Sequence, residues 1–134
     1  IQNLYLNDWV PYKEISKILS KMDILLMPYV SQIKVAGDVG DISKFTSPLK
    51  LFDYLSAGKI IICSDFDVLK EAIKVNHNAI FIKNYTNVFS WKKEIQKLKN
   101  QPNKQLIISK NNHKLSKKYS LTHRAKRIID EIKF

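Results

Sequence analysis

Three short, unbroken apolar runs most constrain what this chain can fold into. They lie at residues 24–27, 60–63 and 79–82, the second within an expected strand at 60–64, and are separated by segments with helical spacing. Strands buried on both faces read as continuous apolar runs rather than as alternating patterns. Such runs alternating with helices are typical of α/β proteins with a parallel sheet. At 134 residues the chain is predicted to form one α/β domain over residues 1–134.

The remaining elements follow from periodicity and capping signals. We expect a short strand at residues 2–6, a turn at residues 8–11 and a long loop at residues 30–46. Apolar spacing predicts helices at 12–22 and 104–118, a short helix capped by Asp65 or Asp67, a helix capped by Thr86, and a final helix starting at Leu121 or Thr122. Helices therefore dominate the last third of the chain.

The segment at residues 48–57 reads as a helix with both ends marked. Ser47 can cap its N-terminus, Pro48 suits its first position, and Gly58 suits a left-handed residue just past its end. Lys50 lies in the first turn. Exposed N–H groups together with a lysine make this helix end a candidate anion site.

Asp53 lies one turn further along the same helix and is suited to accept hydrogen bonds from sugar hydroxyls. The alternative is a surface pair between Lys50 and Asp53, worth about 0.3 kcal/mol. The helix follows the strand ending near Tyr29, so its N-terminus is expected at the carboxyl edge of the sheet, where ligands bind in such folds. Trp9, Tyr12 and Tyr29 are either packing residues or stacking partners for a base or sugar.

Cysteine and histidine usage argues against several chemistries. Cys63 is the only cysteine, which excludes a disulfide within the chain and a multi-cysteine metal site and favours a reducing compartment. It lies in an apolar run, so we expect a buried, unreactive thiol. His77, His113 and His123 lack metal-ligand spacing and are expected at the surface. The sequence therefore indicates no metal site.

The net charge of +11 lies entirely in residues 83–134, which hold 14 of the 23 basic residues and 3 of the 12 acidic ones. Such a block suits nucleic acid, anionic lipid or an acidic partner. The alternative is a set of solvated lysine faces.

Residues 47–65, with the sequence SPLKLFDYLSAGKIIICSD, resemble the donor-binding segment of family-4 (group 1) glycosyltransferases. These retaining enzymes have two Rossmann-like lobes (GT-B), and the C-terminal lobe often carries S-P-L-K-L-F-E-Y-M-A-A-G-K before a strand ending in A-S-D. Weaker similarities to the same lobe occur at residues 10–12, 23–29, 78–82 and 119–125.

The resemblance implies roles for individual residues. Ser47, Pro48, Leu49 and Lys50 would face the diphosphate of a nucleotide sugar, Asp53 would accept the ribose hydroxyls, and Tyr29 would lie near the donor. The donor substrate would be a UDP- or GDP-sugar, with no metal or other cofactor. No catalytic residue is assigned.

The chain departs from the family pattern in ways that bear on activity. Asp53 replaces the usual Glu, and Phe45 stands where many members carry a first acid. The lobe's first strand and helix, with a phosphate-binding Arg and Lys, and the whole acceptor lobe are not among these residues. We therefore expect a partial donor-binding lobe that is inactive in isolation. Because the absent strand is central in the order 3-2-1-4-5, the strands on its two sides would lack a shared neighbour. We therefore expect either that the sheet closes differently or that another chain or segment fills the gap.

The resemblance thus implies a glycosyltransferase that moves a hexosyl group, with retention, to a glycan or lipid-linked acceptor bound by another lobe. We expect a role in cell-envelope polysaccharide, a cytoplasmic location at the inner face of the membrane, an anionic membrane surface as partner, and no nucleic acid. The alternative is a non-catalytic basic module that binds nucleic acid or a protein partner.

Overall fold

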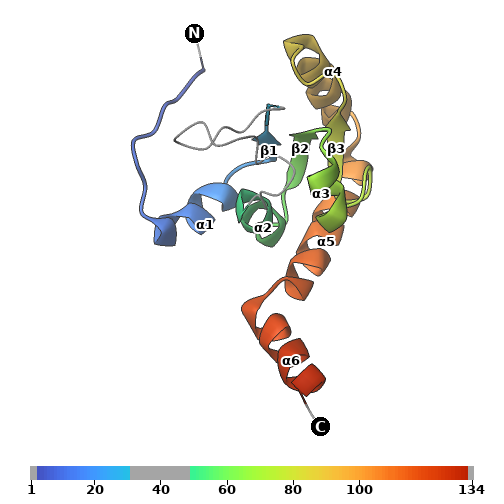
Figure 1. Ribbon diagram of the computed structural model, residues 1–134. Helices are drawn as coiled ribbons and strands as arrows, with labels where there is room; N and C mark the ends of the chain where they lie inside the picture. Colours follow the sequence, from blue (N-terminus) through green and yellow to red (C-terminus); the bar gives the residue numbers. More distant parts are fainter. Residues whose placement is uncertain (1–2, 31–48, 133–134) are drawn as a thin grey trace, which may run out of the picture.

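The computed structural model describes residues 3–30 and 49–132 and has an α/β fold around a three-stranded parallel sheet (Figure 1). The elements in chain order are α1 (Tyr12–Ser20), β1 (Ile24–Met27), α2 (Leu49–Ser56), β2 (Ile60–Ser64), α3 (Asp67–Ala72), β3 (Ala79–Ile82), α4 (Val88–Lys99), α5 (Pro102–Lys118) and α6 (Leu121–Ile132). The predicted Rossmann-like class, with flanking helices and a helical C-terminal third, is confirmed.

The sheet has the strand order β1-β2-β3, and both pairs are parallel. Ile24 is in register with Ile60, and Ile61 is in register with Ala79. Of the two alternatives for a lobe without its first strand, the described strands show the first: the sheet closes differently, because β1 pairs directly with β2 and no gap separates them. The central position of β2 explains why all five of its residues are buried.

Alternate residues along the strands belong to two separate apolar clusters. Ile61 and Cys63 belong to the cluster that includes Leu51 and Leu55 of α2 and Leu69 of α3. The side chains of Ile60 and Ile62 lie on the opposite face, because successive side chains of a strand point to opposite sides.

Ile60 and Ile62 pack in this second cluster with Trp91 and Leu98 of α4 and Ile108 of α5. The sheet is therefore a middle layer between α2 and α3 on one face and α4 and the first part of α5 on the other (Figure 1).

Helix α5 then runs past the start of β2 to reach α2. The Oγ of Ser109 donates to the carbonyl of Gly58 at 2.6 Å, and Nδ2 of Asn112 donates to the carbonyl of Lys59 at 2.8 Å. Gly58 has a φ of +63°, which confirms the predicted left-handed residue after α2. The turn between α2 and β2 is thus fixed both by its own glycine and by α5.

The predicted strand at residues 2–6 is wrong for the residues that are described. Residues 4–10 have no regular structure, and Leu4, Tyr5 and Leu6 are exposed. Among the described strands β1 pairs only with β2 and is an edge strand of the sheet, and residues 4–10 do not pair with its other edge. The turn expected at residues 8–11 is not formed either.

Several helix starts also differ from expectation. The N-cap of α3 is Phe66, without a side-chain hydrogen bond, so neither Asp65 nor Asp67 acts as the cap. Asn87, not Thr86, caps α4, because its side chain accepts from the N–H of Phe89 at 2.9 Å. Helix α5 begins at Pro102, two residues earlier than predicted. The structure does not describe residues 31–48. The loop expected at residues 30–46, except for Val30, and the expected helix start at Ser47 and Pro48 therefore lie outside the described residues.

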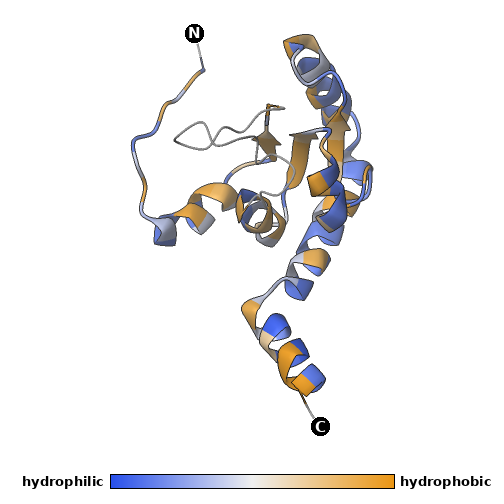
Figure 2. Cartoon of the chain, viewed as in Figure 1, coloured by the Kyte–Doolittle hydropathy of each residue, from blue (hydrophilic) through white to orange (hydrophobic). Residues whose placement is uncertain are grey.

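Helix α6 extends away from the sheet (Figure 1). It begins after Ser120, whose Oγ accepts from the N–H of His123 at 3.2 Å. The ring of Tyr119, at the junction with α5, lies 4.9 Å from that of Phe52 on α2, and its hydroxyl donates to the carbonyl of Ala72 at 3.2 Å. Within Leu121–Ile132 no residue is buried, and Figure 2 shows an apolar stripe along the helix.

Across the described ranges, no helix is both long and apolar enough to cross a membrane.

Candidate functional site

Helix α2 holds three of the candidate binding residues, Leu49, Lys50 and Asp53. Leu51 and Leu55 are fully buried, and this four-residue spacing fixes the rotation of the helix on the core. Lys50 is consequently exposed, and Asp53 is half-buried one turn later. The core-facing leucines therefore present a cation and a carboxylate outside the apolar cluster.

Asp53 is hydrogen-bonded to helix α1 rather than paired with Lys50. The Tyr12 hydroxyl donates to Oδ1 of Asp53 across 3.0 Å. This hydrogen bond, and then the charge of Asp53, raise the pKa of the Tyr12 phenol. Between the described side chains of Lys50 and Asp53 there is no ion pair within 4.0 Å. The structure thus does not contain the alternative surface pair between Lys50 and Asp53.

A pocket of about 450 Å³ lies between α1 and α2, a volume within the usual range for small-molecule sites. Tyr12 and Asp53 both line it. The other lining residues are Lys13, Ile15, Ser16, Leu19, Ser20, Ser56 and Ala57. Apolar side chains, hydroxyls, a lysine and a carboxylate converge there, which suits a ligand with a polar ring and several hydroxyl groups.

Tyr29 lies just past the carboxyl end of β1 and is half-buried against the α2 side of the core. Its carbonyl accepts from the buried hydroxyl of Ser64, at the end of β2, over 2.8 Å. Burial raises the pKa of the Tyr29 phenol. Burial also raises the pKa of Tyr54, with smaller contributions from Tyr29 and Asp53. Tyr29 therefore lies at the carboxyl edge of the sheet, the edge at which ligands bind in such folds.

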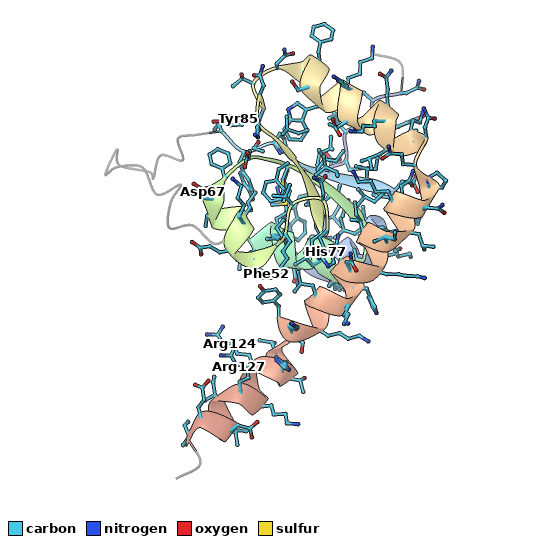
Figure 3. The ribbon with its side chains drawn as sticks, turned by 90° about the vertical axis from the view of Figure 1, so that its right-hand side faces the viewer. Phe52, Asp67, His77, Tyr85, Arg124 and Arg127 are labelled. Carbon is cyan, nitrogen blue, oxygen red and sulfur yellow. The ribbon has the colours of Figure 1, made fainter. Side chains whose placement is uncertain are left out.

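A second lysine near this edge is already neutralised. Lys70 of α3 has its Nζ 2.5 Å from Oδ1 of Asp65 and 3.0 Å from Oδ1 of Asp67. The bonds to Asp65 and then Asp67 raise the pKa of Lys70. Figure 3 shows Asp67 on the exposed side of α3. Lys70 is consequently a poor candidate for holding a phosphate, whereas Lys50 has no such partner among the described side chains.

The predicted site residues are thus only partly assembled. Lys50 and Asp53 lie together on α2, Leu49 is 77% exposed at its start, and Tyr29 lies at the sheet edge. Ser47 and Pro48 are outside the described residues. The contact of Tyr12 with Asp53 was missed, because 41 residues separate the two and no local pattern links them.

Cys63 is a buried free thiol, as predicted. Burial, and then the charge of Asp65, raise the pKa of Cys63 to about 12. The three histidines are exposed, also as predicted. In the described part of the chain, no group of three His, Cys, Asp or Glu side chains comes close enough to hold a metal ion.

The sequence model of the family described as "Glycosyl transferases group 1" matches residues 2–115. This chain therefore belongs to the group 1 glycosyltransferases, a class of enzymes that transfer glycosyl groups, as predicted. The match includes α1 and all of α2, with Tyr12, Lys50 and Asp53. No curated protein and no solved structure gave a match.

Proposed function

We propose that this chain is the donor-binding lobe of a retaining glycosyltransferase that uses a UDP- or GDP-sugar. The observation that carries the proposal is the placement of Lys50 and Asp53 one turn apart on α2, with Asp53 lining a pocket, in a chain of the group 1 family. The lysine suits the anionic diphosphate of a nucleoside diphosphate, and the carboxylate suits the hydroxyl groups of its ribose. The family alone supports only glycosyl transfer in general.

Lys50 is the proposed diphosphate ligand. It lies in the first turn of α2, where backbone N–H groups without helical partners favour an anion. During transfer, the bond between the sugar's anomeric carbon and the diphosphate oxygen breaks, and a bond to the acceptor oxygen forms. Negative charge grows on the departing diphosphate, and a fixed cation there lowers the barrier.

Asp53 is the proposed ribose ligand. A carboxylate accepts stronger hydrogen bonds from hydroxyl groups than a neutral acceptor does. Its Oδ1 already accepts from Tyr12, and Oδ2 has no hydrogen bond among the described residues. Asp53, which lines the pocket, therefore keeps acceptor capacity at Oδ2.

The proposed overall reaction moves a hexosyl group, with retention and without a metal, to a glycan or lipid-linked acceptor. The acceptor would be bound by a second lobe, and the product would contribute to cell-envelope polysaccharide. These assignments come from the family resemblance of residues 47–65, which includes the segment at α2.

Calorimetric titration of the chain with UDP and with GDP tests the proposal. We expect one of them to bind, and Asp53→Asn to weaken binding roughly tenfold, the effect of losing a hydrogen bond to a charged group. Asp23→Asn, at an exposed position before β1, is the matched control and should bind like the wild type. Absence of binding to either nucleotide, or equal affinities of the two variants, would contradict the proposal.

An anionic membrane surface is the proposed further partner, for a cytoplasmic chain at the inner face. Helix α5 carries lysines and no acidic residue, namely Lys104, Lys110, Lys114, Lys117 and Lys118. On α6 the apolar side chains of Ile128, Ile129 and Ile132 are 48%, 58% and 60% exposed, and Arg124 and Arg127 lie on the same helix (Figure 3). An exposed apolar stripe beside basic residues favours binding at an anionic lipid interface.

Co-sedimentation with vesicles tests this partner. Binding to vesicles containing phosphatidylglycerol should exceed binding to pure phosphatidylcholine and should fall at high salt. The double variant Ile129→Gln/Ile132→Gln should bind more weakly at unchanged net charge. Equal binding to both lipids would count against a membrane role, and tight, salt-sensitive binding to nucleic acid would instead favour the basic-module alternative.

A further inference from the structure

The phenol of Tyr12 reaches from the first residue of α1 to the middle of α2. Its ring is 74% exposed, so burial does not explain its orientation. The hydrogen bond to Oδ1 of Asp53, at 3.0 Å, is the side-chain interaction that fixes it. Tyr12 and Asp53 both line the pocket between the two helices. A ligand in that pocket would therefore meet the bonded pair rather than an isolated carboxylate.

The bond constrains the carboxylate in a way that α2 alone does not. The terminal torsion of an aspartate is broad, so a free carboxylate turns between many orientations. A phenol held on Oδ1 restricts that rotation, and a hydrogen bond to a charged acceptor is stronger than a neutral one. Oδ2 is then left for a ligand, because it has no partner in the parts of the chain that the structure describes.

We propose that Tyr12 is a positioning residue that orients the carboxylate of Asp53 toward the ribose of the bound nucleotide. The inference rests on the proposed function, since it assigns a partner to the ribose-binding acid. It goes beyond that function because it makes α1 part of the ribose site. It also explains how an aspartate, with one methylene fewer than a glutamate, is held in a fixed orientation at this position.

The contact itself can be tested without nucleotide. The raised pKa of the Tyr12 phenol has the bond to Asp53 as its largest cause. In NMR titrations of chain labelled at the tyrosine ring, Asp53→Asn should therefore lower the pKa of Tyr12. The control Asp23→Asn, at an exposed position before β1, should leave the pKa of Tyr12 raised. An unchanged pKa of Tyr12 would overturn the inference at once.

The consequence for binding is tested with UDP, GDP and their 2′-deoxy forms. Tyr12→Phe keeps the ring and removes the hydroxyl. We expect it to weaken ribonucleotide binding roughly threefold to tenfold while changing 2′-deoxynucleotide binding much less. The ratio of ribo to deoxy affinity should therefore fall. A residue that only ties α1 to α2 would change both affinities equally, and that result would overturn the inference.

Matched variants separate this inference from the function on which it rests. Tyr5→Phe makes the same chemical change outside the pocket and should leave both affinities at the wild-type level. If Asp53→Asn weakens binding but Tyr12→Phe keeps the wild-type affinity ratio, the positioning role fails and the proposed function stands. If the wild-type chain binds no nucleotide, both fail.

Discussion

Asn78 and Asn112 form a buried side-chain pair that connects the approach to β3 with helix α5. Nδ2 of Asn78 donates to Oδ1 of Asn112 across 3.1 Å, and the two residues are 3% and 0% exposed. Asn112 in turn donates to the carbonyl of Lys59, and Oδ1 of Asn78 accepts from the N–H of Lys74 at 3.1 Å. The pair thus joins the chain before β2, the chain before β3 and α5 in one network.

Substitution Asn112→Ala should destabilise the fold by about 1–3 kcal/mol, because it leaves buried polar groups at Asn78 and Lys59 without partners. The measurement is the midpoint of urea unfolding at an unchanged slope. Asn111→Ala is the matched control. Asn111 bonds to His77 at the surface, where water can replace the lost contact (Figure 3 labels His77). An equal loss of stability in both variants would contradict the prediction that the burial of Asn112 makes its substitution more destabilising.

We expect Gly58→Ala to lower the free energy of unfolding by about 1–2 kcal/mol, because a residue with a Cβ is strained at a φ of +63°. Space is not the cause, since an added Cβ would lie 3.6 Å from Cβ of His113, an ordinary contact. Gly58→Asn should cost less, because asparagine tolerates the left-handed region. Thermal unfolding of both variants checks this, and a larger loss for Asn than for Ala would argue against backbone strain.

Cys63 should make stability fall in alkaline solution. Its pKa is about 12 in the folded chain and near 8.5 when unfolded, so only the unfolded form loses the proton between these values. The unfolded state then binds fewer protons than the native state, and the free energy of unfolding decreases as pH rises from about 8.5 toward 12. Cys63→Ala should show a shallower decline over that range in unfolding titrations at each pH.

The same buried thiol should be inert toward a thiol reagent at neutral pH, because the thiolate is the reactive form. We expect the wild-type chain to react with a disulfide reagent at a rate limited by unfolding. Addition of urea above the unfolding midpoint should make the reaction fast. Rapid modification of the folded chain would show that the thiol is more accessible than its 0% exposure indicates.

Lys50→Ala should weaken binding of UDP or GDP roughly tenfold and leave binding of the corresponding nucleoside nearly unchanged, because the ammonium would contact the diphosphate alone. Lys17→Ala removes the same charge from an exposed position on α1 and serves as the control. Calorimetry with diphosphate and nucleoside distinguishes the cases. Equal losses for both ligands would mean that Lys50 does not act on the phosphates.

The elements that the sequence predicted well are those that short-range signals define. The apolar runs became β1, β2 and β3 at the expected residues, and Gly58 has the conformation predicted from its place after α2. The errors lie where local signals compete or tertiary partners decide. Thr86 and Asn87 are both good caps, and only the geometry of the chain selects Asn87. The run at residues 2–6 has strand composition, but its described part has no neighbouring strand.

For the site, the sequence by itself determined which groups are available and their spacing along α2. Lys50 and Asp53 are one helical turn apart because helical periodicity puts them there, and Leu51 and Leu55 turn them away from the core. Only the tertiary structure decided the partner of Asp53. It bonded Asp53 to Tyr12, which lies 41 residues away on another helix. This contact crosses from α1 to α2 through space, and no local pattern in the sequence encodes it.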